Sequence, residues 1–131
     1  MGELPGMCEL VRLDSSTTVY VADIKSGTIS QIPELASLCP KIDFIYLFGS
    51  CLETRCTNDS DIDLAIIANI GMSKLINSKG FREFKEKLYN IDIDQDYDFL
   101  YFRSVEQIKN SPDFVCRDII DKGKIIYEKE L

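Results

Sequence analysis

Two acidic residues, Asp61 and Asp63, stand in a segment that is otherwise typical of a buried β-strand. The segment DIDLAIIA, residues 61–68, is rich in β-branched and aliphatic residues, and a similar run, KIDFIYLF at 41–48, precedes it. Alternate residues of a strand point to the same face, so both carboxylates should lie on one side of the sheet. The pattern predicts two neighbouring strands, one of which carries an acidic site.

A third acidic residue, Asp98, has a similar setting in DQDYDFLYF, residues 94–102. Its apolar neighbours place it inside a strand, and Asp96 is the alternative if the strand has another register. Carboxylates that lie close together disfavour each other's ionisation, and a hard divalent cation relieves this repulsion. Oxygen ligands suit Mg²⁺ or Mn²⁺. Asp61, Asp63 and Asp98 are therefore the predicted metal ligands and catalytic residues.

Calcium and zinc fit the chain less well. An EF-hand loop starting at Asp59 would need glycine at its sixth position and glutamate at its twelfth, where the chain has Leu64 and Ile70. Cys51 and Cys56 could form half of a zinc site, but the chain has no histidine and no matching second pair. The five cysteines are expected to be free thiols.

Gly49 and Ser50 directly follow the apolar run at 41–48. Where a strand turns into the start of a helix, free backbone N–H groups can bind phosphate, and glycine permits close approach of the ligand. The Ser50 hydroxyl adds a donor. Phosphate donors beside paired carboxylates predict phosphoryl or nucleotidyl transfer.

The remaining pattern predicts a single small α/β (α+β) domain with a mixed sheet flanked by helices. Residues 1–29 are expected to form an N-terminal extension, in which the arms ELVRL and TTVYVADI predict a β-hairpin. Residues 30–131 form the main domain. Its predicted strands are 41–48, 61–68, 94–102 and 124–128, its predicted helices are Gln31–Cys39, Phe81–Asn90 and 112–122, and one or two helical turns are expected at 104–110.

Composition limits the partners. The chain has 131 residues, of which 22 are acidic and 15 basic, and the resulting net charge of −7 argues against binding to extended nucleic acid. No segment approaches the roughly 20 apolar residues of a membrane span. The N-terminus lacks the pattern of a signal peptide, so a cytoplasmic location is expected.

The chain resembles the DNA polymerase β-like nucleotidyltransferases. Gly49-Ser50, ten further residues and then Asp61-Ile62-Asp63 match the signature of this family, and Asp98 stands where the family carries its third carboxylate. The segment FVCRDIIDKGKIIYE is similar to the helix, glycine and strand that end the family's domain. The resemblance covers roughly residues 41 to 128, and the small size is similar to that of the minimal, MNT-type branch.

This resemblance implies the polymerase β-like nucleotidyltransferase fold and a metal-dependent transfer of AMP from ATP, or of another nucleoside monophosphate from its triphosphate, to a hydroxyl acceptor. Mg²⁺ or Mn²⁺ would be the cofactor. In the minimal branch the resemblance implies a separately encoded, helical HEPN-type toxin, which is silenced by AMP placed on a tyrosine. An antitoxin role is therefore the leading expectation, and self-association stays open.

The chain departs from the family pattern at Glu53, where many relatives carry a basic residue, and its nearest basic residue is the displaced Arg55. This departure supports an alternative, in which an inactive relative neutralises its partner by contact alone. A sugar transferase with an Asp-x-Asp motif is a third hypothesis, against which the upstream Gly-Ser argues.

Overall fold

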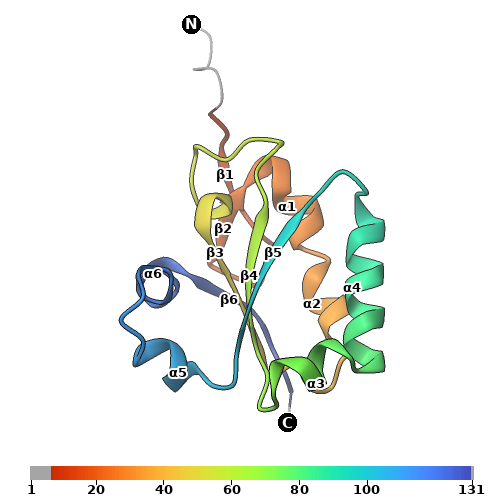
Figure 1. Ribbon diagram of the computed structural model, residues 1–131. Helices are drawn as coiled ribbons and strands as arrows, with labels where there is room; N and C mark the ends of the chain where they lie inside the picture. The colour runs from red at the N-terminus through yellow and green to blue at the C-terminus, as the bar shows by residue number, and fades with distance from the viewer. Residues whose placement is uncertain (1–6, 131) are drawn as a thin grey trace, which may run out of the picture.

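A computed structural model describes residues 7–130, and its centre is a mixed sheet of four strands (Figure 1). The strands are β3 (Phe44–Phe48), β4 (Ile62–Ile67), β5 (Tyr97–Phe102) and β6 (Lys124–Glu128), in the spatial order β5-β4-β3-β6. β3 pairs antiparallel with both β4 and β6, whereas β4 and β5 run parallel. A parallel pair needs a long crossover, and the helical segment between β4 and β5 provides it.

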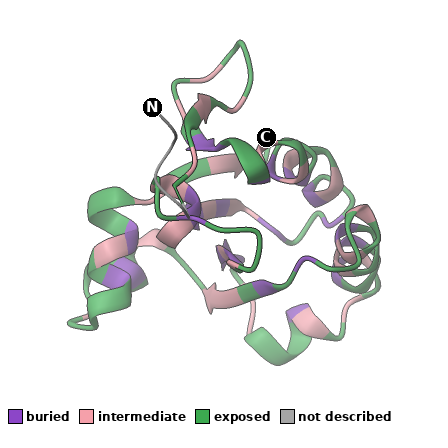
Figure 2. Ribbon diagram, turned by 90° about the horizontal axis from the view of Figure 1, so that it is seen from above, coloured by how far each residue is buried: buried purple, intermediate pink, exposed green. Residues whose placement is uncertain are grey.

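Helices cover both faces of this sheet. On one face lie α1 (Asp23–Ile29), α2 (Ile32–Ala36) and α4 (Lys79–Ile91), with α3 (Met72–Ile76) leading into α4, and on the other lie α5 (Val105–Lys109) and α6 (Phe114–Lys122). In α4, Phe81, Phe84 and Leu88 recur at helical spacing and are buried. Figure 2 shows the same division in the helices, whose buried residues face the sheet.

The alternation along β4 decides which side chains enter which core. Residues 62, 64 and 66 are completely buried in the larger core, which β4 shares with α1, α2 and α4. Ala65 and Ile67 enter a smaller core that includes residues of α5 and α6. Asp63 has the parity of this second set, so its carboxylate emerges on the α5–α6 side of the sheet.

A short antiparallel hairpin, β1 (Leu10–Arg12) and β2 (Tyr20–Ala22), precedes α1. Val21 and Ala22 are fully buried in the larger core, so the hairpin is attached to the sheet rather than separate from it. The division of the chain at residues 29 and 30 stays a prediction. None of the helices within residues 7–130 is long and apolar enough to cross a membrane.

The predicted sheet strands are confirmed, three with later starts, but several helix boundaries are wrong. The helix expected over Gln31–Cys39 is shorter, because α2 begins only after Gln31 and ends at Ala36. Ser30, the residue before the predicted range, ends α1. Helix α6 begins after Asp113 rather than at Pro112, while the glycine that stops it is where the sequence predicts.

Candidate active site

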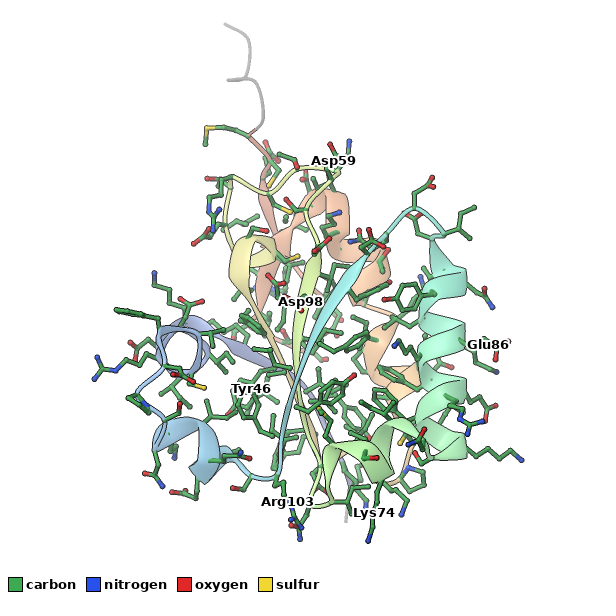
Figure 3. The ribbon with its side chains drawn as sticks, in the orientation of Figure 1. Tyr46, Asp59, Lys74, Glu86, Asp98 and Arg103 are labelled. Atoms are coloured by element: carbon green, nitrogen blue, oxygen red, sulfur yellow. The ribbon has the colours of Figure 1, made fainter. Side chains whose placement is uncertain are left out.

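The pairing of β4 with β5 brings two of the predicted carboxylates together. Asp63 and Asp98 are direct partners in the register of these parallel strands. Asp61 stands immediately before β4, two residues from Asp63, and Asp96 stands immediately before β5. Figure 3 shows Asp98 near the start of its strand, on the side of the sheet that faces away from α4. The register thus favours Asp98 over Asp96 as the neighbour of Asp63.

Gly49 lies directly beneath the Asp63 carboxylate. It opens a single 3-10 turn, η1 (Gly49–Leu52), at the end of β3, and the preceding Phe48 is the register partner of Asp63. The backbone of Gly49 has a φ of 80°, and a Cβ atom there would collide with Asp63 Oδ2. Glycine is therefore required twice, once for the left-handed conformation and once for the close approach.

Ser50, the other predicted phosphate-binding residue, is half-buried in the same turn. Its carbonyl accepts a hydrogen bond from the Glu53 N–H, at 2.9 Å. Among residues 7–130 no protein group bonds the Ser50 hydroxyl, which leaves this hydroxyl available to a ligand.

Partial burial and the neighbouring charges disfavour the ionised form of Asp63. The pKa of Asp63 is raised to about 6, first because partial burial removes water from the carboxylate, and then because Asp98 and Asp61 repel its charge. Asp118 on α6 adds a smaller effect of the same sign, and Arg55 acts in the opposite direction. Asp118 is a member of this acidic group that the sequence did not reveal, because only the fold brings α6 to β4.

This donor set fits a divalent cation in its chemistry. Within the described part of the chain, no three acidic, cysteine or histidine side chains are already gathered as a formed metal cluster. However, Asp61, Asp63 and Asp98 supply carboxylate oxygens, and the raised pKa of Asp63 reflects partial burial together with a repulsion from Asp98 and Asp61 that a cation would remove. Mg²⁺ also binds through one or two carboxylates together with substrate phosphates, so it does not need a complete protein cage.

Glu53 is paired with Arg55. The Arg55 Nε donates to Glu53 Oε2 in an ion pair that is exposed to solvent. The negative charge of Glu53, the residue at which the sequence departs from the family pattern, is therefore partly neutralised by Arg55. Because Arg55 also acts on the pKa of Asp63, its positive charge lies within electrostatic reach of the acidic group.

A pocket of about 470 Å³ opens beside Gly49. This volume lies within the range of about 300 to 1,000 Å³ that is typical of small-molecule sites. The lining contains Asp118 but none of the three predicted ligands, so the pocket adjoins the acidic group rather than enclosing it. Its lining residues come from the hairpin, η1, α6 and β6, and are Leu10, Thr18, Tyr20, Gly49, Leu52, Glu53, Asp118, Asp121, Lys122 and Lys124.

All five cysteines are free, as predicted, and all but Cys8 are buried. Burial raises the pKa of Cys51 to about 12. A thiol with so high a pKa is protonated at neutral pH and is therefore a poor nucleophile. The buried Cys51 therefore has a packing role beneath the site.

Comparison with known proteins completes this description. The family model described as Polymerase beta, Nucleotidyltransferase matches residues 30–130. No curated protein gives a significant match. Among solved structures, the chain is similar to a mutant of the toxin-antitoxin MntA-HpeT, with 22% identity over 78% of this chain and 74% of that one, and a TM-score of 0.53. It also matches a toxin-antitoxin crystal structure with AMP-PNP, with 24% identity over 79% and 73% of the two chains and a TM-score of 0.49.

Proposed function

Because the chain belongs to the polymerase beta nucleotidyltransferase family, we propose that it transfers AMP from ATP to a hydroxyl group on a partner protein. The observation that carries this proposal is the β4–β5 register, which pairs Asp63 with Asp98 on the face where Gly49 makes room for a carboxylate. Such a juxtaposition of acidic oxygens and a close backbone approach suits a triphosphate that is held next to its acceptor.

In the proposed reaction the acceptor oxygen attacks the α-phosphorus of ATP. An oxygen–phosphorus bond forms, the bond to the β-phosphate bridging oxygen breaks, and pyrophosphate leaves. Asp98 is exposed at the start of β5, so an acceptor can reach it, and we assign it the hydroxyl proton. Gly49 and Ser50 would contact the triphosphate, through a backbone N–H group and the free hydroxyl.

Asp61, Asp63 and Asp98 would hold Mg²⁺ or Mn²⁺, which when bound neutralises phosphate charge and lowers the pKa of the acceptor hydroxyl. The residues of the chain contribute orientation. Asp63 is fixed between Phe48 and Asp98 by the two strand pairings, so the direction of its carboxylate is set before any ligand arrives.

A partner protein is proposed as the acceptor because the fold is similar to that of a protein solved as part of a toxin-antitoxin pair. This similarity, at a TM-score of 0.53, supports an antitoxin role. That the partner is a helical, HEPN-type toxin is our proposal from the resemblance to the minimal branch of the family. Phe114, at the start of α6, is 89% exposed and lies four residues before Asp118, on the same side of the helix. An exposed aromatic residue beside the acidic group suits a protein interface.

The test is incubation of the protein with α-labelled ATP, Mg²⁺ and the product of the adjacent gene, followed by mass measurement of that product. We expect the mass of one adenylate to be added by the wild type and lost in Asp98→Asn, with ATP affinity largely kept. Asp59→Asn, at the tip of the preceding loop and away from Asp98 (Figure 3), is the matched control and should retain transfer.

The competing hypothesis, an inactive binding module, predicts a different result. If the partner is silenced without a change of mass, and equally by the wild type and by Asp98→Asn, the transfer reaction is wrong. If instead the wild type labels and silences the partner and Asp98→Asn does neither, neutralisation by contact alone is excluded.

A further inference from the structure

Two polar side chains are buried away from the acidic face, and both lie behind the segments that carry the aspartates. Lys25 of α1 is 3% exposed and Gln95, just before β5, is 5% exposed. They are 70 positions apart in the sequence and contact each other directly, since Lys25 Nζ donates to Gln95 Oε1 at 2.6 Å. Burial of a lysine is expensive unless its donors are satisfied, so this contact calls for an explanation.

Lys25 and Gln95 join three segments of the chain. Lys25 Nζ also donates to the Asn58 carbonyl, at 3.0 Å. The Gln95 Nε2 group donates to the carbonyls of Ser60, at 3.0 Å, and Asp96, at 2.6 Å. The loop that leads to Asp61 is thereby tied to the residues that lead to Asp98, with α1 behind both.

The charge of Lys25 fixes the orientation of the Gln95 amide group. An ammonium group can only donate hydrogen bonds, so it requires the oxygen of the Gln95 amide on its own side. The amide nitrogen then must point toward the two carbonyls. Within residues 7–130 both acceptors of Lys25 are neutral oxygens and no carboxylate pairs with it, which distinguishes this contact from an ordinary buried ion pair.

Two further bonds continue the attachment of the same loop. The Ile62 N–H donates to the Asp96 carbonyl, at 3.1 Å, and the Cys51 thiol donates to the Asp61 carbonyl, at 3.5 Å. The backbone on either side of Asp61 is therefore held from below by buried donors. A carboxylate at the end of such a segment is preorganised, because its backbone cannot shift independently.

We propose that Lys25 is a positioning residue for the acidic site, acting through Gln95 to keep the starts of β4 and β5 together. The proposal rests on the function proposed above. It also gives a role to the N-terminal segment, because Lys25 lies outside residues 30–130, the part matched by the family model. The acidic site thus depends on a helix, α1, that lies outside the residues of this chain that the family model matches.

The first test is hydrogen exchange in the protein without metal, nucleotide or partner. Lys25→Met removes the charge and both bonds but keeps most of the side-chain volume. We expect exchange in the segments 57–62 and 95–98 to rise about tenfold or more relative to the buried amides of β3, because the segments lose their common attachment. Lys87→Met, the same change at an exposed position of α4, is the control and should leave the ratio unchanged.

The second test measures Mn²⁺ binding by the same proteins. Lys25→Met should weaken Mn²⁺ affinity about tenfold, and Lys87→Met should not. If Lys25→Met does not fold, Gln95→Met takes its place, since it keeps the cation and removes only the bridging amide. Where both variants fold, their double mutant should lose no more affinity than either single one, because the two residues act as a unit.

A uniform rise in exchange across the protein with unchanged Mn²⁺ affinity would overturn the proposal and leave Lys25 with a purely structural role. Strict additivity of the two substitutions would overturn it as well. Neither measurement uses ATP or the partner, so absence of AMP transfer by the wild type would count against the proposed function alone.

Discussion

The raised pKa of Asp63, caused first by partial burial and then by repulsion from Asp98 and Asp61, makes a quantitative prediction about stability. This pKa is raised from 3.8 to about 6, and a difference of this size corresponds to about 3 kcal/mol at 1.36 kcal/mol per pKa unit. Asp63 is partly exposed, so solvent screening reduces the effect to about 1–2 kcal/mol. Asp63→Asn keeps the shape of the side chain and removes its charge. The variant should therefore be more stable than the wild type by this amount at neutral pH.

The direction with pH follows from proton binding. Because the folded protein holds the Asp63 proton more tightly than the unfolded chain does, rising pH lowers wild-type stability between about 3.8 and 6. Above this window the full penalty applies, and below it both states are protonated and the penalty disappears. The advantage of Asp63→Asn should thus be largest at pH 7.5 and should shrink toward pH 4.

Urea unfolding at several pH values measures the difference, with the midpoint and slope compared between the proteins. Asp59→Asn, an exposed loop residue, should change stability by less than about 0.5 kcal/mol and serves as the control. Added Mg²⁺ should reverse the order, stabilising the wild type but not Asp63→Asn. If the variant is no more stable than the wild type at pH 7.5, or if its advantage does not depend on pH, then burial and the neighbouring carboxylates do not raise the pKa of Asp63 in the folded protein.

Three further substitutions test separate parts of the site. Gly49→Ala should destabilise the protein by about 1–3 kcal/mol, from backbone strain and the collision with Asp63, and Asp63→Ala should relieve part of this cost in urea unfolding. Glu53→Gln frees Arg55 and should tighten ATP binding by about two- to fivefold in calorimetry, less at high salt; unchanged affinity would mean that this ion pair lies away from the nucleotide. Phe114→Ser should weaken partner binding about tenfold without lowering the protein's own melting temperature, and unaltered binding would remove α6 from the interface.

The strands and the two paired carboxylates could be predicted because their signals are local. In β4 and β5 the β-rich composition extends over six residues each, and a parity rule is enough to put Asp63 and Asp98 on the face opposite to their immediate apolar neighbours. The glycine at position 49 was predicted from its spacing to the acidic pair. The reason that no other residue fits at position 49 is the Asp63 Oδ2 atom, with which a Cβ atom would collide, and this contact is visible only in the folded structure.

The helices that were missed are short and weakly marked. Helix α1 has the sequence DIKSGTI, in which glycine and threonine are poor helix formers, and no side chain caps its start. Its buried residues are Lys25 and Ile29, four positions apart, so tertiary contacts rather than propensity hold it. The burial of Lys25 could not be predicted, because hydrophobic periodicity assigns a lysine to the exposed face of a helix.

The register of β4 and β5 explains what the hydrogen bonds of the buried Lys25 and Gln95 contribute, despite the free-energy cost of burying a lysine. A slip of one residue between these strands would send Asp98 to the opposite face, while Asp63 stayed where it is. The two strands are joined by a crossover of nearly thirty residues, so the connection itself cannot fix their register. Gln95 bonds the carbonyls of Ser60 and Asp96, one on each side of the pair, and Lys25 holds the amide in the orientation that makes both bonds possible. In the proposed site, placement of the Asp98 carboxylate thus depends on neutral carbonyls and a buried cation that lie behind the acidic face.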